Sequence, residues 1–554
     1  MIYRLAVATL LPVIVYVLVG LSRKSRAQNI DEYFVYGKTV STMDYANTSV
    51  GYALQMAAIF LFAYWGARFG IGGLWTPLFW MLGFGLLYKL LPKFMSYHTK
   101  SGTMHEFLAQ TFGAGPSLQF IAALATIFGL WGTMMAEIDY TLQIYAPFLT
   151  RPLFQYILGA AFLIFGVSYI VAYGFKAEVN TERVQVPVAY ACLIAVLILT
   201  VPSVWLNGNP KSYTVTVTLL ATTLVLMIVA KVRINMPKPF TDRQVFIPIL
   251  GLIGLFFVHE WLSKHFLAMQ GHNATILNAP LREQFRAQGL LTLVSLFLAN
   301  ALWMPVDLST WQRIASVHKG NNDDDLLNRL RRGTWRVMLE SPASWCLGVV
   351  LGLIIQGGGF LKPGQDASEG LTAFASVLAS QGVSTPAAWL SSWLYPIFVA
   401  ACVAIMLSTV DSIISAIAFT ACKDLPPYRT MTSIRSARVW TVVIMLVGLV
   451  VYPILRQTLG ANLQTILYTA YSCQLSLVVV TILALYQRRL DKRAAILSVV
   501  LGLVATGLSG YFATKSSNPD IGVLPPIFAI VGAAAGYLIG IRPTIPVVAR
   551  SSTT

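Results

Sequence analysis

The chain has 554 residues, of which 56% are hydrophobic and only 11% are charged, whereas soluble domains carry roughly 25% charged residues. This composition excludes a string of soluble domains and predicts one polytopic membrane domain, with no separate catalytic domain outside the membrane. The net charge of +17 does not imply nucleic acid, because basic cytoplasmic loops produce such an excess in membrane proteins.

Apolar segments of bilayer length recur along the whole chain and predict about 15 membrane spans. Their approximate limits are 3–22, 43–66, 72–96, 117–148, 153–174, 184–205, 213–231, 245–263, 287–308, 335–356, 393–419, 437–455, 462–486, 494–513 and 522–541. The first is followed by Arg23-Lys24-Ser25-Arg26 and lacks a small-residue cleavage site, so it is interpreted as a retained span. Most Lys and Arg residues fall in alternate loops, which predicts a cell-membrane protein with its N-terminus outside and its C-terminus cytoplasmic.

Three regions between the spans carry further expectations. The segments 213–231 and 245–263 are joined by basic residues and are interpreted as a hairpin of two spans. If they lie on the membrane surface instead, the total falls to about 13. The largest inside loop, Arg313 to Arg336, is expected to be solvated and to set the orientation. The outside loop Gly357 to Pro386 could include short gating helices.

A polar run interrupts the apolar segment 393–419. Ser408 and Thr409 are followed by Asp411 and Ser412, and such groups are costly inside a bilayer unless they meet an ion, a cavity or each other. The two hydroxyls offer hard oxygen ligands without a charge, which suits a weakly held monovalent cation such as sodium. The run therefore predicts that the protein moves something using an ion.

Four motifs in the correct order resemble the sodium:solute symporter family. They are Asp31-Glu32-Tyr33-Phe34 with Gly37, a turn from Tyr173 to Gln185, Trp311-Gln312-Arg313, and Leu407 to Leu425. The resemblance covers roughly residues 5–490 and implies an all-α polytopic fold with two inverted five-helix repeats, the arrangement also seen in the bacterial leucine transporter. In that fold the first helix of each repeat, that is the first and sixth core helices, is broken at mid-membrane.

The resemblance places the broken helices at 43–66 and 287–308. The first contains several polar residues, and the second carries Pro305 and Asp307 near its inner end. Proline removes a backbone donor and frees a carbonyl, although a simple kink remains the alternative. The chain then divides into an N-terminal span and cytoplasmic loop (1–42), a first repeat (43–205), an inserted hairpin and outside loop (206–284), a second repeat (285–490), and C-terminal spans with a short cytoplasmic tail (491–554).

The resemblance also implies a sodium site, residue by residue. Ser408 and Thr409 match two hydroxyl ligands of the ion. The backbone carbonyl ligands are matched by Ile405, one turn earlier, and by Gly51 and Leu54 on the first broken helix. The alternative is that the hydroxyls bond to carbonyls of their own helix.

Two acids are assigned to an ion exit path beside this site. Glu182 matches a shorter acid of the family near the inward sodium exit, and Asp411 could stabilise the same path or pair with a cytoplasmic-side arginine.

The candidates for the solute site are polar or aromatic residues in the core spans. They are Gln55, Trp131, Glu137, Asp139, Trp303, Asp307, Tyr468, Tyr471 and Gln474. Acids within a span mark a pathway by default, so Glu137 and Asp139 could bind a cationic substrate, take up a proton or pair with Arg68. The aromatic residues could instead serve packing or anchor the spans at the membrane interface.

These observations predict a secondary active transporter that couples symport of a small organic solute to sodium by alternating access. Sodium is the expected coupling ion, with no organic cofactor, and the expected partners are the solute and the lipid bilayer, without nucleic acid. The sequence contains no Walker A motif, metal-spaced histidine cluster or nucleophile elbow, so an enzyme is not expected. Two alternatives stay open: a proton-coupled transporter, in which Glu137, Asp139 or Glu182 carries the proton, and a symporter-like membrane sensor with a separate signalling partner.

Overall fold

A computed structural model of the chain describes residues 2–541 except for short segments at 22–26, 28, 101–102, 150, 208–209, 321, 362–366, 381–387, 426–432, 460–462, 489 and 517–518, and one longer segment at 234–288. The second half of the predicted hairpin, 245–263, and the predicted tail after residue 541 lie outside the described residues.

The described residues fold into helices, which confirms the predicted all-α class. Among them the structure contains no β-ladder, only one isolated parallel bridge between Val40 and Val317. Ten helical segments of the described part are long and apolar enough to cross a membrane, as expected of a multi-pass membrane protein.

The helices follow one another along the chain in this order: α1 (Ile2–Leu21), α2 (Ile30–Val35), α3 (Thr42–Ala53), α4 (Met56–Phe69), α5 (Trp75–Lys100), α6 (Met104–Thr111), α7 (Gly115–Gln143), α8 (Pro152–Tyr173), α9 (Phe175–Thr200), α10 (Pro202–Leu206), α11 (Pro210–Arg233), α14 (Leu290–Ala301), α15 (Leu308–Ser316), α16 (Asp323–Gly357), α17 (Gly370–Ala379), α18 (Ala388–Asp424), α19 (Ile434–Leu459), α20 (Leu463–Leu475), α21 (Val478–Leu485), α22 (Lys492–Lys515) and α23 (Pro525–Gly540).

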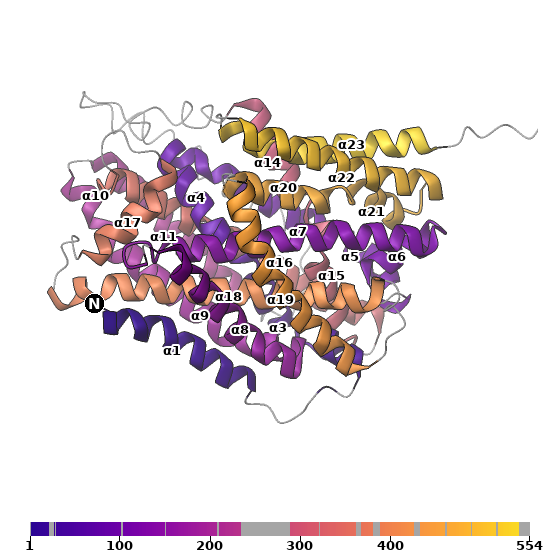
Figure 1. Ribbon diagram of the computed structural model, residues 1–554, viewed down its shortest axis with the longest axis horizontal. Coiled ribbons are helices and arrows are strands. Elements are labelled where there is room, and N and C mark those ends of the chain that lie inside the picture. Colours follow the sequence, from indigo (N-terminus) through magenta and orange to yellow (C-terminus); the bar gives the residue numbers. More distant parts are fainter. Residues whose placement is uncertain are drawn as a thin grey trace, which may run out of the picture.

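Burial separates a central group of helices from a peripheral one. In their most apolar stretches α16 and α18 are 94% and 89% buried, whereas α1 and α22 are only 28% and 33% buried. Figure 1 shows α22 and α23 side by side along one edge of the bundle and α1 along the opposite edge. The polar residues considered below lie on or beside the central helices.

Two predicted loops are in fact largely helical. The segment from Tyr173 to Gln185, expected as a turn, is interrupted only at Gly174, whose positive φ of 66° ends α8 and starts α9. The expected loop Arg313–Arg336 contains the end of α15 and the start of α16. Asn322 caps α16, and three aspartates in its first turn favour helix there because they face the positive end of the helix dipole.

Both helices predicted to be broken are interrupted. Between α3 and α4, Leu54 and Gln55 leave the helical conformation. Between α14 and α15 the chain forms a short 3-10 turn, Met304–Val306, followed by extended Asp307. Pro305 lies in this turn, so the segment is a true interruption and not a kinked helix.

Each interruption is stabilised by a tryptophan indole. Trp345 of α16 donates to the Ala53 carbonyl at the end of α3 (2.7 Å), and Trp311 of α15 donates to the Pro305 carbonyl (2.8 Å). Carbonyls at a helix end have no partner within the helix, and leaving one unpaired in an apolar interior is costly. The Trp311 indole thus pairs the Pro305 carbonyl, and the Trp345 indole adds a second donor to the Ala53 carbonyl, which also accepts from the Gln55 N–H (2.9 Å).

Candidate functional site

The two hydroxyls of the polar run in α18 face the first interruption. The Thr409 hydroxyl lies 3.4 Å from the Leu54 carbonyl oxygen and 3.3 Å from the Ile405 carbonyl oxygen. The bond to Ile405 is the within-helix alternative expected from sequence, and it occurs together with the contact to Leu54 on the other helix. All of these groups are buried.

Glu182 of α9 completes this group. The Ser408 hydroxyl donates to Glu182 Oε2 (2.9 Å), and the same carboxylate lies against the backbone of Gly51, where a Cβ atom would overlap it. The structure therefore brings together the five residues of the predicted sodium site, and Glu182 lies beside them.

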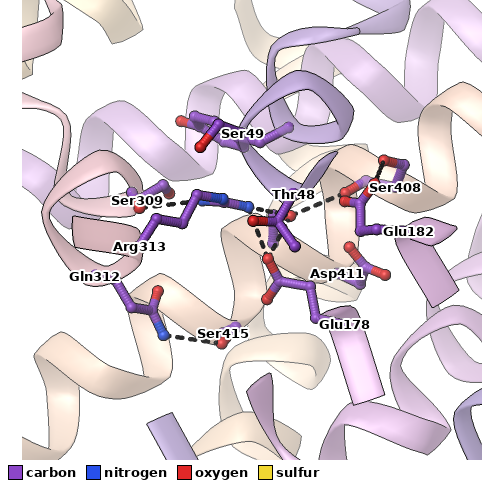
Figure 2. Close-up of polar contacts among 12 residues, drawn as sticks. Thr48, Ser49, Glu178, Glu182, Ser309, Gln312, Arg313, Ser408, Asp411 and Ser415 are labelled. Atoms are coloured by element: carbon purple, nitrogen blue, oxygen red, sulfur yellow. Dashed lines mark hydrogen bonds and ion pairs between the residues drawn. The ribbon is translucent and has the colours of Figure 1, made fainter. Parts of the chain in front are cut away.

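A second acid, Glu178, lies one turn before Glu182 on α9 and forms a buried ion pair. Arg313 of α15 donates to Glu178 Oε1 (2.7 Å) and to the hydroxyl of Ser412 (2.8 Å). Its guanidinium also lies 4.7 Å from the ring centroid of Tyr52. Figure 2 shows Arg313 reaching from α15 toward Glu178, with Glu182 and Asp411 close by.

Asp411, the third acid, accepts a hydrogen bond from Tyr169 (2.6 Å). The pairing with an arginine that was considered for Asp411 is made by Glu178 instead. Gln185 also donates to the Tyr169 hydroxyl (3.4 Å). We call Glu178, Glu182 and Asp411 the acid cluster. All three side chains are fully buried.

The acid cluster has more oxygens than donors. Among the described residues, Glu178 Oε2, Glu182 Oε1 and Asp411 Oδ1 have no hydrogen-bond partner. Charges at short range in a low-dielectric interior interact strongly, and Arg313 can compensate only one carboxylate. The cluster can therefore bind a cation or a proton chemically, and the Ser408 and Thr409 hydroxyls add neutral oxygen ligands beside it.

Four of the nine solute candidates form one group beside the two interruptions. Tyr471 donates to Gln55 Oε1 (2.6 Å), and its ring centroid lies 5.0 Å from that of Trp303. Tyr52 donates to Asp307 Oδ1 (3.0 Å) and stacks on Trp303 at 6.1 Å. Gln55, Trp303 and Tyr471, together with the acid Asp307, are thus linked by direct contacts.

Glu137 contacts the first interruption from another helix. Its carboxylate oxygens accept hydrogen bonds from the backbone N–H groups of Met56 (2.7 Å) and Ala57 (3.0 Å), at the start of α4. It does not pair with Arg68, which donates to Tyr64. Glu137 thus caps the start of α4 across 80 and 81 residues of sequence.

The remaining solute candidates make other contacts. Asp139 accepts from Gln143 of its own helix (3.4 Å), and Trp131 is only partly buried. Gln474 packs closely against Gly129 of α7, and Tyr468 lies 6.3 Å, ring to ring, from Tyr471.

A cavity of about 250 Å³ lies one helical turn beyond Glu137. Phe60 of α4 and Tyr140 of α7 line it, with ring centroids 4.9 Å apart, and Gln143, Leu371 and Gln464 are among its other lining residues.

Sequence reasoning missed Glu178, Ser412 and Tyr169. Glu178 and Glu182 are spaced i, i+4, as are Ser408 and Ser412, so each pair lies on one face of its helix. This spacing would have indicated two polar faces meeting, once the Tyr173–Gln185 segment was treated as helix.

Comparison with solved structures relates the fold to known transporters. A Na⁺-coupled sialic acid symporter, in a substrate-bound outward-open state, is similar over 97% of this chain and 97% of its own, with a TM-score of 0.62 and 14% sequence identity. MhsT in complex with L-phenylalanine gives a TM-score of 0.44 at 14% identity, over 91% of this chain and 99% of its own. The manganese transporter of Eremococcus coleocola gives a TM-score of 0.48 at 14% identity, over 94% of this chain and 98% of its own. No protein-family model and no curated protein matches the chain. The chain therefore has the fold of the sialic acid symporter.

Proposed function

We propose that the protein is a secondary active transporter that couples uptake of a small organic solute to sodium. The observation that carries this proposal is the convergence of three elements on one buried point: the first interruption (Gly51, Leu54), α18 (Ser408, Thr409) and α9 (Glu182). Oxygen ligands from carbonyls, hydroxyls and one carboxylate suit a hard monovalent cation. The fold shared with a Na⁺-coupled symporter supports the same ion.

In this proposal sodium acts by joining helices. The ion binds between Leu54, Ile405 and the hydroxyls of α18, and Glu182 supplies the negative charge that offsets it. Binding orders the first interruption, which also contacts the solute group through Gln55 and Tyr52. Coupling follows because each ligand favours the conformation that the other needs.

The direct test is the thermal stability of the purified protein in sodium against equimolar potassium. The wild type is expected to gain stability in sodium, and the Ser408→Ala/Thr409→Ala variant is expected to lose that gain. Thr420→Ala is the matched control, because the Thr420 hydroxyl donates only to Ala416 of its own helix (3.1 Å). Equal stability of the wild type in the two ions would reject sodium coupling.

Proton coupling is the second candidate, and the acid cluster favours it. Of the three buried carboxyls, Glu178 forms an ion pair with Arg313, whereas Glu182 and Asp411 accept only from hydroxyls among the described side chains, so either a cation or a proton can neutralise them. If sodium binds Glu182, lowering the pH weakens sodium binding, because the carboxylate must be deprotonated to act as a ligand. Glu182→Gln is expected to abolish this pH dependence. If protons drive transport, the same variant loses pH-driven flux, and flux does not depend on sodium.

Flux also separates transport from sensing. In proteoliposomes the proposed symporter accumulates its solute when a sodium gradient is imposed. A sensor keeps sodium-dependent ligand binding and shows no accumulation.

A further inference from the structure

Both helices that restart after an interruption already have a carboxylate at their N-terminus. Glu137 accepts from the first two N–H groups of α4, and Asp307 accepts from Ser309 N (3.3 Å) and Thr310 N (2.8 Å) at the start of α15. A helix N-terminus carries unpaired N–H groups and a partial positive charge, which is why it binds anions. In this chain the anion-binding positions at both helix N-termini are occupied by carboxylates of the protein itself, Glu137 and Asp307.

Because the two caps occupy N–H groups at both helix N-termini, few such groups remain to bind an anionic solute. Asp307 also accepts from the hydroxyls of Thr310 (2.7 Å) and Tyr52 (3.0 Å), so it is held firmly in place. A solute carboxylate or phosphate bound to Gln55 and Trp303 would lie beside the Met56 and Ala57 N–H groups that Glu137 occupies, and beside Tyr52, which stacks on Trp303 and donates to Asp307. The repulsion of like charges in this buried region disfavours such a solute.

Within the group formed by Gln55, Trp303, Tyr471 and Asp307, the buried side-chain atoms without a hydrogen-bond partner among the described residues are two donors. Gln55 Nε2 and Trp303 Nε1 have no hydrogen-bond partner among the described residues, and both side chains are buried to at least 99%. Buried polar groups are normally paired, so each of these N–H groups calls for an acceptor. An ammonium group offers no acceptor and cannot satisfy them.

From these contacts we propose that the solute is an uncharged polar molecule with hydrogen-bond acceptor oxygens, of the amide or polyol class, and that Glu137 determines specificity by excluding anions. This proposal rests on the proposed transport function in one respect, because it assumes that the bound molecule is the transported solute. Gln55 and Trp303 donate to the acceptor oxygens, and Glu137 and Asp307 keep the two helix ends closed to carboxylates.

The test uses acetamide and acetate, which have nearly the same shape and differ in charge. Their binding to the purified full-length protein is measured by ligand-induced thermal stabilisation, with ethylammonium as the cationic probe. The wild type is expected to respond to acetamide and not to acetate or ethylammonium. Stabilisation of the wild type by acetate or ethylammonium, or its failure to respond to acetamide, would overturn the proposal.

Substitution of Glu137 gives the second half of the test. Glu137→Ala frees the Met56 and Ala57 N–H groups, and we expect its affinity for acetate to be about tenfold higher than that of the wild type, or about 1.4 kcal/mol. Glu106→Ala, which removes an acid from α6 instead, is the matched control and keeps the wild-type pattern. An unchanged acetate affinity in Glu137→Ala contradicts the role given to Glu137.

Two features keep the test decisive. If Glu137→Ala does not fold, Glu137→Gln removes the charge while retaining an acceptor, and its acetate affinity is again expected to exceed that of the wild type. The test measures binding of the probes to the protein, so its result is separate from the test of sodium coupling. Loss of sodium dependence with an intact acetamide preference would count against symport alone, and the reverse pattern would count against this proposal alone.

Discussion

The Glu182 carboxylate lies in the space that a side chain at position 51 would fill. A Cβ atom on Gly51 would overlap this carboxylate, while Ser408 donates to the same oxygen from the other side. Glycine at position 51 is therefore required by the close approach of α9 to α3, and not by a positive φ at that position. The contact fixes the acid against the first interruption.

Replacing Gly51 with alanine should displace Glu182 from this position. Overpacking of this kind typically costs about 1–3 kcal/mol. We expect the Gly51→Ala variant to lose its sodium-dependent gain in thermal stability. Gly507→Ala is the control, since no atom lies within 4 Å of a Cβ at that position of α22. A Gly51→Ala variant that responds to sodium like the wild type would show that Glu182 does not need this contact.

Arg313 should be essential for folding because it compensates a fully buried acid. Arg313→Met leaves Glu178 unpaired, and breaking a buried pair on one side costs about 3–5 kcal/mol. Denaturation or thermal melting measures the loss, and adding Glu178→Gln should restore part of it. For comparison, Arg183 is 40% exposed in its pair with Asp44, so Arg183→Met should cost at most about 1 kcal/mol. Similar losses for the two variants would contradict this assignment.

Trp345 should support the first interruption through its indole N–H. Trp345→Phe keeps an aromatic ring against Trp80, whose ring centroid lies 4.2 Å away, but removes the indole donor and leaves the Ala53 carbonyl with only the Gln55 N–H (2.9 Å). Losing one such hydrogen bond costs about 0.5–1.5 kcal/mol. The variant should melt at a lower temperature and bind sodium more weakly, because Leu54 follows Ala53 directly. Trp389→Phe is the control, since Trp389 is 67% exposed.

Asp424 should hold the end of α18 to the region around α6. It accepts from Thr103 (2.6 Å) and Gln119 (2.8 Å) and lies 2.7 Å from Nδ1 of His105. Asp424→Ala leaves these partners unsatisfied in a buried position, so we expect a loss of several kcal/mol by thermal or chemical unfolding. Asp31→Ala should have little effect, because Asp31 is 68% exposed in its 3.6 Å contact with Lys423. Equal stability of the two variants would refute the proposed role.

The helices could be predicted from apolar length, which is a local signal. The two interruptions were placed by the family resemblance, and the polar residues of the first and Pro305 of the second agree with that placement. Ser408, Thr409 and Leu54 could be placed together only through the family resemblance. The role of Glu137 could not be predicted, because its partners are backbone groups 80 and 81 residues away, and nothing in its neighbours indicates them. The Arg313–Glu178 pair was missed because α9 was expected to begin at residue 184, which left Glu178 in a loop.

The two interruptions differ in where their supports come from. The backbone of the first interruption is hydrogen-bonded by side chains of other helices, Glu137 of α7 and Trp345 of α16. The backbone of the second is hydrogen-bonded by Asp307 and Trp311, which belong to its own segment. Tilting α4 against α7 or α16 must break those hydrogen bonds. Moving α15 against α9 or α3 leaves the bonds within its own segment intact, but it must break the Arg313–Glu178 ion pair and the Tyr52–Asp307 hydrogen bond. The first interruption is therefore tied to neighbouring helices through its backbone, and the second through the side chains of Arg313 and Asp307.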